Sequence, residues 1–454
     1  MTGLRKMIAG CLLIAMLLSL GCLFASAEKA ADPSPDLTNA SAVYFYHMES
    51  QRSVVAKNET QKVPAGTSVR LLSGLIFCER LGDRMSEWVE IHEEMLRASK
   101  TSYRYGIEAG EFYTVEQLLY LALCGGYNDA FYVLAYRLGN GNIQTFVDLM
   151  NARAAELGAN DTSVADPSGI ADSSFTTALD LFHIAQEATE HPVYMKISGS
   201  AYYDLAAGRR IENRNSLISA AQDGKRYYNS LCKGLTAGST DVSGWSVITM
   251  AQKGNDRYLS VVLGGKEGTG DAPEKYGYSI TNRLIQWGYD NFRYLEVLNS
   301  DTLICSIPVE VSDLTASVQV KPLEAFSLYL PADAEVGEDV RLNVRLLYET
   351  LEAPVAAGTH VGYVAIIYQG EIMGTVPIYT AEEAIRSEFV GVLMRIKKLT
   401  ESRAARAGLI FFAVTLTAWI LTEYIIKRVR RHRWDRYFSE KIDTSETFLT
   451  RLQK

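Results

Sequence analysis

A long apolar stretch limits what the C-terminal part of this chain can fold into. Residues 407–426 read AGLIFFAVTLTAWILTEYII, and Glu423 is the only charged side chain among them. A helix of about 20 such residues is long enough to cross the hydrocarbon core of a bilayer. Basic residues follow at once, namely Lys427, Arg428, Arg430, Arg431, Arg433 and Arg436. This pattern predicts a transmembrane helix over 407–426 and a basic cytoplasmic tail over 427–454.

The N-terminus carries the features of a secretory signal peptide. The basic pair Arg5-Lys6 precedes an apolar run, and Ala25-Ser26-Ala27 follows it as a small-residue cleavage pattern. The sequence therefore predicts a signal peptide over 1–27 that is cleaved near Ala27. A lipoprotein site at Cys22 is the alternative, but the residues before it have the wrong order for one. Both ends together place residues 28–402 outside the cell membrane.

Length and composition narrow the class of protein. A chain of 454 residues predicts two folded units plus attachments, and 48% hydrophobic with 22% charged residues is typical of chains that bury a core. The net charge of −8 does not favour nucleic acid as a partner. The chain has no C-x-x-C pair, Walker loop or HExxH motif, so we expect neither a metal nor a cofactor. The cysteines after the signal peptide show no framework spacing and are expected to be buried thiols: Cys78, Cys124, Cys232 and Cys305.

The region between the two ends divides into three parts. Residues 38–292 mix predicted strands (41–48, 258–264) with predicted helices (71–79, 114–138 broken at Gly125-Gly126, and 279–287). Residues 293–378 are rich in Val, Leu and Thr with turn residues between them, which predicts a small β-rich domain. The capping-box pattern at Thr380-Ala381-Glu382-Glu383 predicts a juxtamembrane helix over 380–404.

Several segments of residues 38–292 follow one known pattern in order. They are VVAKNETQKVPAGTSVRLLSGL, YTVEQLLYLALCGGYNDAFYVLA, LMNARAAELGANDTSVADPSGIADSSFTTALDL, IENRNSLI, LCKGLTAGSTDVSGWSVITMA and YLSVVLGG. Together they resemble the D-alanyl-D-alanine carboxypeptidases, the low-molecular-weight penicillin-binding proteins of the serine peptidase type. The resemblance implies an α+β chain: a penicillin-binding-protein/β-lactamase-like transpeptidase domain, then a small β-rich domain and membrane attachment.

The first catalytic motif of that family, S-x-x-K, has lost its reactive pair here. The serine attacks the peptide carbonyl, and the lysine three residues later activates it. Counting from Pro64-Ala65 gives Gly66 and Val69, whereas counting back from the following helix gives Thr67 and Arg70, which we favour. A threonine can attack, but an arginine stays protonated and cannot act as the base.

The second and third motifs are also incomplete. S-x-N corresponds to Gly126-Tyr127-Asn128, and K-T-G corresponds to Thr236-Ala237-Gly238. Both serines and both lysines of the family site are therefore replaced, at Thr67, Arg70, Gly126 and Thr236. By resemblance, the positions left to bind a substrate are Asn128, Gly238, Ser239 and Thr240.

The resulting prediction is a catalytically inactive relative that binds peptidoglycan stem peptide or a cell-wall enzyme outside the membrane. A closed cleft that leaves only the outer surface for contacts is a variant of this reading. The alternative is an active D-Ala-D-Ala carboxypeptidase that uses Thr67, or a displaced Ser68, as nucleophile. No histidine lies in a motif that would make it the general base for this alternative, and a lone histidine such as His47 is usually structural.

Overall fold

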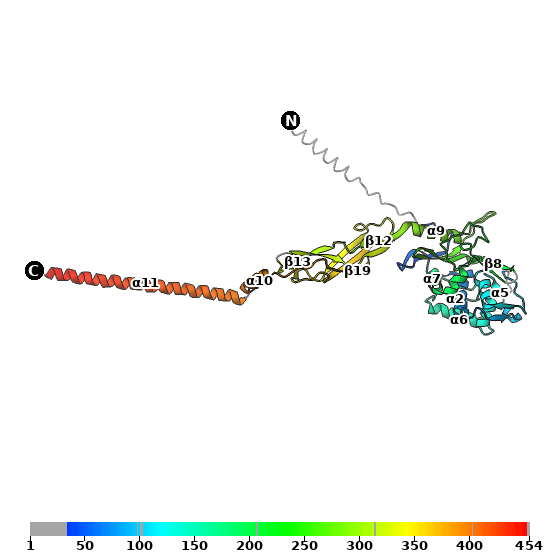
Figure 1. Ribbon diagram of the computed structural model, residues 1–454, viewed down its shortest axis with the longest axis horizontal. Coiled ribbons are helices and arrows are strands. Elements are labelled where there is room, and N and C mark those ends of the chain that lie inside the picture. The colour runs from blue at the N-terminus through cyan, green and yellow to red at the C-terminus, as the bar shows by residue number, and fades with distance from the viewer. Residues whose placement is uncertain are drawn as a thin grey trace, which may run out of the picture. The chain divides into compact units, whose positions relative to one another are not determined.

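The computed structural model describes residues 34–97, 99, 103–205, 208–312, 315–401 and 403–451 (Figure 1). The predicted signal peptide lies outside these residues. The chain forms two compact units. The first runs to Leu295 and includes Leu328–Ala334, and the second comprises Glu296–Ser327 and the chain from Glu335 onward.

A five-stranded antiparallel sheet with the order β2-β1-β11-β10-β9 forms one part of the first unit. Its central strand β11 is buried on both faces, because alternate side chains point to opposite sides of a strand. Val261 joins a hydrophobic cluster with Phe182 of α7, whereas Val262 joins another with Leu284 of α9. The strands are β1 (Ala42–His47), β2 (Arg52–Lys57), β9 (Thr236–Thr240), β10 (Gly244–Lys253) and β11 (Asp256–Gly265).

Helices form the other part of this unit, with α2 at its centre. Every residue from Leu71 to Cys78 is buried, as expected for a helix that is apolar all round. The predicted break in the 114–138 helix is confirmed, because Gly126 takes a φ of +69° between α4 and α5. The helices are α2 (Val69–Leu81), α3 (Glu93–Leu96), α4 (Val115–Leu123), α5 (Asn128–Leu138), α6 (Ile143–Glu156), α7 (Ala178–Glu190), α8 (Pro192–Ser198) and α9 (Tyr276–Asn291).

Short strand pairs complete the first unit. They are β3 (Val63–Pro64) with β6 (Phe175–Thr176), β4 (Trp88–Glu90) with β5 (Phe112–Thr114), and β7 (Tyr202–Asp204) with β8 (Arg210–Glu212). The β3–β6 pair ties the segment before α2 to the segment before α7. It thereby fixes the start of α2, where the predicted site lies.

The second unit contains the predicted β-rich domain. Its six-stranded sheet has the order β16-β18-β19-β14-β13-β17. The strands are β13 (Cys305–Glu310), β14 (Ser317–Pro322), β16 (Val340–Leu346), β17 (Leu351–Glu352), β18 (His360–Tyr368) and β19 (Glu371–Thr380). A separate pair consists of β12 (Phe292–Leu298) and β15 (Phe326–Pro331).

The juxtamembrane helix predicted over 380–404 was placed too early, because α10 spans Glu388–Glu401. Thr380 ends β19, and its hydroxyl donates to the Ala356 carbonyl at 2.7 Å while it accepts from the Thr359 N–H at 3.0 Å. The threonine that the pattern assigned to a helix cap therefore closes a strand connection instead.

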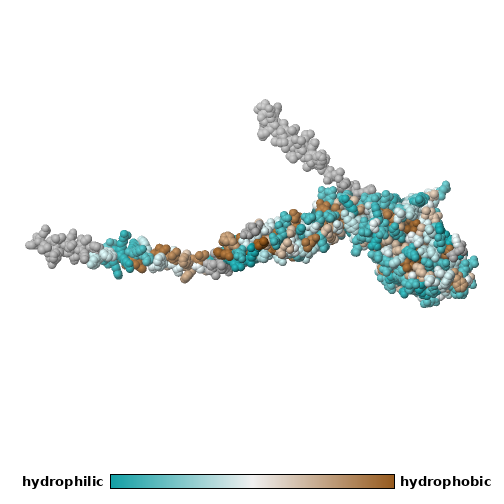
Figure 2. Space-filling view, in the orientation of Figure 1, coloured by the Kyte–Doolittle hydropathy of each residue, from teal (hydrophilic) through white to brown (hydrophobic). Residues whose placement is uncertain are grey.

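The predicted span lies within a single long helix, α11 (Arg403–Arg451). Its segment Arg406–Tyr437 is long and apolar enough to cross a membrane. The most apolar 18-residue window of this segment has a mean hydropathy of 1.9, and none of that window is buried. Hydrophobic residues gather along this helix in Figure 2.

Candidate functional site

Thr67, rather than Gly66, is the residue with a side chain opposite strand β9, and it lies in the short 3-10 helix η1 (Gly66–Ser68) that precedes α2. A Cβ on Gly66 would stand 2.0 Å from Ser243 Oγ, and the φ of this glycine is +48°, so no side chain fits there. Thr67 packs against the other motif strand, since a Cβ on Gly238 would meet its Oγ1 at 2.8 Å. Of the two registers that the sequence allowed, the structure brings Thr67 and Arg70 into the cleft.

Ser68, the displaced alternative, faces away from this cleft. Its hydroxyl is buried and donates to the Ala65 carbonyl at 2.6 Å. Thr67 Oγ1 is also buried, and it has no hydrogen-bond partner among the residues that the structure describes. Thr67 thus has the placement of a nucleophile but no neighbouring group that takes its proton.

Arg70 contacts residues of two other segments that border the cleft. Its Nε donates to the Ser168 carbonyl at 2.9 Å, and its Nη2 donates to Asn128 Oδ1 at 2.8 Å. A Cβ on Gly126 would lie only 3.1 Å from Arg70 Nη1. The larger cation and the missing serine of the second motif are therefore sterically linked.

The charge of Arg70 excludes it as a general base. Burial, together with the neighbouring charge of Arg214, lowers the pKa of its guanidinium to about 10. At pH 7 the group remains a cation, which can attract an anion but cannot accept a proton from Thr67.

A cavity of about 180 Å³ opens between α2, the α4–α5 connection and β9. Its cationic lining consists of Arg70, Arg214 and Lys275, and no carboxylate lines it within the described part of the chain. The remaining polar and aromatic lining includes Thr67, Tyr103, Phe131, Tyr194, Asn213, Asn215, Ser216, Gln222, Thr236, Ser239, Trp245 and Tyr278. The cavity therefore has a positive character.

Of the four positions expected to bind a substrate, two line the cavity and two do not. Gly238 and Ser239 line the cavity. Asn128 is buried with its carbonyl oxygen held by Arg70. Thr240 is the last residue of β9, and its hydroxyl donates to Ser243 Oγ in the β9–β10 turn at 2.9 Å. Of the degenerate motif positions, Thr67, Arg70, Gly126 and Thr236 all line the cavity.

Sequence reasoning missed Arg214, Lys275 and Tyr103. Arg214 lies with its guanidinium carbon 3.9 Å from the centre of the Tyr103 ring. Arg214 lies in the segment IENRNSLI, which resembles the family pattern and could have pointed to it. The contact of Arg214 with Tyr103, however, depends on a loop that belongs to none of the motifs. That loop is fixed by the Asp129 carboxylate, which accepts from the backbone N–H groups of Tyr105 (3.1 Å) and Gly106 (2.8 Å).

Cys124 also lines the cavity, but it is not a reactive thiol. Burial raises its pKa to about 12, with a smaller contribution from the charge of Glu212. A thiol with this pKa is protonated at pH 7 and is a poor nucleophile. The expectation of buried thiols is confirmed for Cys78, Cys124 and Cys232, but it is wrong for Cys305, which is only partly buried.

The Asp223–Lys275 ion pair at the cavity edge makes a testable contribution to stability. Burial works to raise the pKa of Asp223, but hydrogen bonds from Lys275, at 2.6 Å, and from Ser216 outweigh it and lower the pKa. Because the pKa of Asp223 is lower in the folded state, its ionised form stabilises the fold at pH values above the unfolded-state pKa of about 3.9. This contribution is lost as the pH falls through the folded-state pKa.

We therefore expect Asp223→Asn to flatten the pH dependence of the unfolding free energy below about pH 4. Urea unfolding at a series of pH values between neutral and acidic measures this slope. Asp290→Asn, at an exposed position on α9, is the matched control and should keep the wild-type slope. An unchanged slope in Asp223→Asn would contradict the assignment.

Comparison with known proteins agrees with this geometry. The family model of the D-alanyl-D-alanine carboxypeptidases matches residues 27–267, and that of the C-terminal domain of penicillin-binding protein 5 matches residues 292–385. The D-alanyl-D-alanine carboxypeptidase DacF of Bacillus subtilis is 22% identical over 401 residues, which cover 86% of this chain and 97% of the relative. DacA of Escherichia coli is 26% identical over 276 residues, covering 60% and 64% respectively.

Solved structures show the same fold. Penicillin-binding protein 5 from Haemophilus influenzae gives a TM-score of 0.55 at 21% identity, covering 78% of this chain and 100% of that one. Penicillin-binding protein 6B from Escherichia coli gives 0.56 at 18% identity, covering 77% and 97%. The family model matches more than half of this chain, so the chain belongs to the D-alanyl-D-alanine carboxypeptidase family.

Proposed function

We propose that this chain is a membrane-anchored extracellular member of its family that performs no acyl transfer and binds the peptidoglycan stem peptide. The observation that carries the proposal is the position of Arg70. It stands where the activating lysine is needed, holds Asn128, and remains a cation. Thr67 consequently has no base beside it.

The cavity nevertheless retains features that suit a peptide. Strand β9 lies at the edge of its sheet, so one side of its backbone has no strand partner. An extended peptide can add to such an edge through main-chain hydrogen bonds. Arg70 and Arg214 supply positive charge for an anionic end, such as a C-terminal carboxylate, whereas Lys275 is already paired with Asp223.

Anchoring and orientation are part of the same proposal. The apolar segment within α11 would hold the protein in the membrane, and the signal peptide over 1–27 would deliver residues 28–402 to the outer side. The basic residues after the span would keep the tail over 427–454 in the cytoplasm. A cell-wall enzyme as partner remains the alternative occupant of the cleft.

A binding experiment on the full chain in detergent tests the proposal. A stem pentapeptide ending in D-Ala-D-Ala is titrated by calorimetry, and the same peptide with an amidated C-terminus is the control. We expect the carboxylate form to bind at least about tenfold more tightly, because only it meets the cationic lining, and no D-Ala to be released. Equal binding of both peptides, or no binding of either, would contradict a stem-peptide site.

A further inference from the structure

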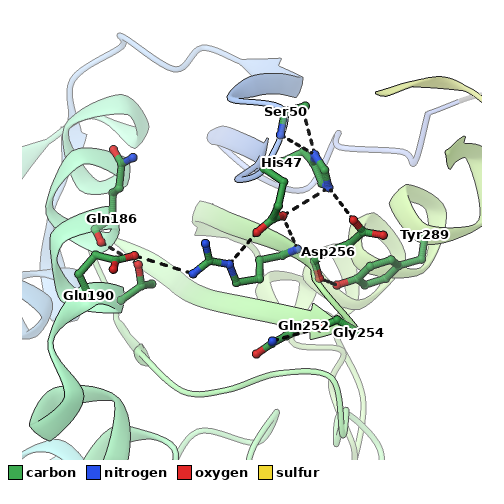
Figure 3. A network of polar contacts seen from close by, with 11 residues as sticks. His47, Ser50, Gln186, Glu190, Gln252, Gly254, Asp256 and Tyr289 are labelled. Carbon is green, nitrogen blue, oxygen red and sulfur yellow. Dashed lines mark hydrogen bonds and ion pairs between the residues drawn. The ribbon is translucent and has the colours of Figure 1, made fainter. Parts of the chain in front are cut away.

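A second cluster of titratable side chains lies at the C-terminal end of β1. Strands β1 and β11 pair with His47 opposite Tyr258, and the Met48 N–H donates to the Arg257 carbonyl at 2.9 Å. This register brings Asp256 next to the end of β1 although about 200 residues separate them in the sequence (Figure 3). Glu49 follows His47 by two residues, in the turn that connects β1 to β2.

His47 is buried in an unusual way. Its side chain is 0% exposed, yet Nε2 has no hydrogen-bond partner among the residues that the structure describes. Nε2 instead faces two carboxylates, with Glu49 Oε2 at 3.6 Å and Asp256 Oδ1 at 3.8 Å. Both distances are too long for a direct hydrogen bond, and buried polar atoms are rarely left without one.

We propose that His47, Glu49 and Asp256 bind a divalent transition-metal ion, with Zn²⁺ as the best match. One imidazole and two carboxylates are ligands that Zn²⁺ accepts. Two ligand atoms on a tetrahedral zinc ion lie about 3.4 Å apart, as follows from metal–ligand bonds of about 2.0–2.2 Å. The distances of 3.6 Å and 3.8 Å from Nε2 exceed this value by a few tenths of an ångström. All three ligand atoms lie within 4.8 Å of one another, so the two carboxylates need to approach each other by at most about 1.4 Å.

Neighbouring groups hold these ligands in place. The His47 ring stacks on Tyr329, with centroids 3.7 Å apart and planes within 6°. Ser50 Oγ lies 2.9 Å from Nδ1 and can accept a hydrogen bond from a protonated Nδ1. In that tautomer the lone pair of Nε2 is available to the ion. The Ser50 N–H also lies 3.2 Å from Nδ1 and favours the other tautomer, so ion binding at Nε2 selects between the two.

The carboxylates are oriented and remain accessible. Arg257 donates to Glu49 through Nε and through its backbone N–H, each at 2.7 Å, which fixes the carboxylate while leaving lone pairs toward His47. The side chains of Glu49 and Asp256 are 24% and 39% exposed, so an ion can reach the site and water can complete its coordination. None of the three ligands lines the cleft cavity, so the inference is independent of the proposed function.

The test uses the full chain in detergent after removal of metal with EDTA. Calorimetric titration with Zn²⁺ is expected to show one equivalent bound at micromolar or lower Kd. Asp256→Asn and Glu49→Gln should each weaken this binding at least tenfold. Glu190→Gln is the matched control, because this exposed carboxylate pairs with Arg257 at 3.8 Å but is not one of the three residues of the cluster, and it should leave the Kd unchanged.

A spectroscopic measurement on the wild type guards against variants that fold poorly. Co²⁺ in place of Zn²⁺ should give visible absorption bands that saturate at one equivalent and that Zn²⁺ abolishes. Absence of these bands together with no stoichiometric Zn²⁺ binding would overturn the proposal. So would Zn²⁺ binding with the same Kd in wild type, Asp256→Asn and Glu49→Gln, since the ion would then lie elsewhere.

Discussion

Replacing Gly169 by alanine is expected to lower the free energy of unfolding of the first unit by about 4 kcal/mol. Gly169 has a φ of +76°, a conformation that L side chains rarely adopt. A Cβ there would lie 2.0 Å from the Gly66 carbonyl oxygen and 3.0 Å from Thr67 Cα. Both contacts are with backbone, so the segment that positions Thr67 would have to move.

Gly208→Ala separates the two causes of this loss. Gly208 has the same φ of +76°, but none of the residues that the structure describes lies within 4 Å of its added Cβ. Its substitution should therefore cost only the conformational part, about 1 kcal/mol. Urea unfolding followed by circular dichroism measures both variants, and equal losses would show that the close approach of Gly169 to Gly66 is not a constraint on the fold.

Arg70→Ala is expected to affect both stability and binding. The change removes hydrogen bonds to the Ser168 carbonyl and to Asn128 Oδ1, and hydrogen bonds from a charged group contribute about 1.5–3 kcal/mol each. It also removes one of the cations that line the cavity. We expect a loss of about 3 kcal/mol in unfolding free energy and a stem-peptide Kd raised about 100-fold.

Arg70→Lys is the matched variant for this prediction. It keeps the positive charge but loses the fork geometry, so it should recover much of the binding and little of the stability. Calorimetry with the stem peptide and urea unfolding give the two readouts. A folded Arg70→Ala protein with wild-type affinity for the peptide would contradict the role assigned to the cation.

Elements with strong local signals could be predicted from the sequence. The apolar run of α2, the glycine pair before α5 and the buried strand β11 are each fixed by residues within one segment, and the structure confirms them. The α+β fold and the family followed because several such segments occur in the order that the family requires. Local patterns were sufficient wherever one segment alone decides the outcome.

The features that were missed depend on contacts between distant segments. Thr380 matches a helix cap by sequence, but its partners Ala356 and Thr359 come from another strand connection. The contact of Arg70 with Gly126 joins two motifs, and only their placement shows that the changes are coupled. His47 appeared structural because Asp256, which it faces, lies on β11.

The arrangement of the cleft could not be predicted from the sequence for the same reason, because it depends on contacts between distant segments. The sequence identified the replaced motif residues but left two registers open for the first motif. Steric exclusion of any side chain at Gly66 by Ser243 distinguishes them, and Ser243 lies far along the chain in the β9–β10 turn. The positive lining contributed by Lys275 likewise comes from outside every motif.

The most direct test of the central claim is covalent labelling of the full chain in detergent with a fluorescent penicillin, followed by a denaturing gel. Loss of the nucleophile alone slows a serine hydrolase by about a million-fold, and the proposed function has Arg70 in place of the activating lysine as well. The account predicts no labelled band, beside a strongly labelled active carboxypeptidase of the family and a normal circular-dichroism spectrum. A band that disappears in Thr67→Ala or Ser68→Ala would contradict it and show that the family's chemistry has been rebuilt on another hydroxyl.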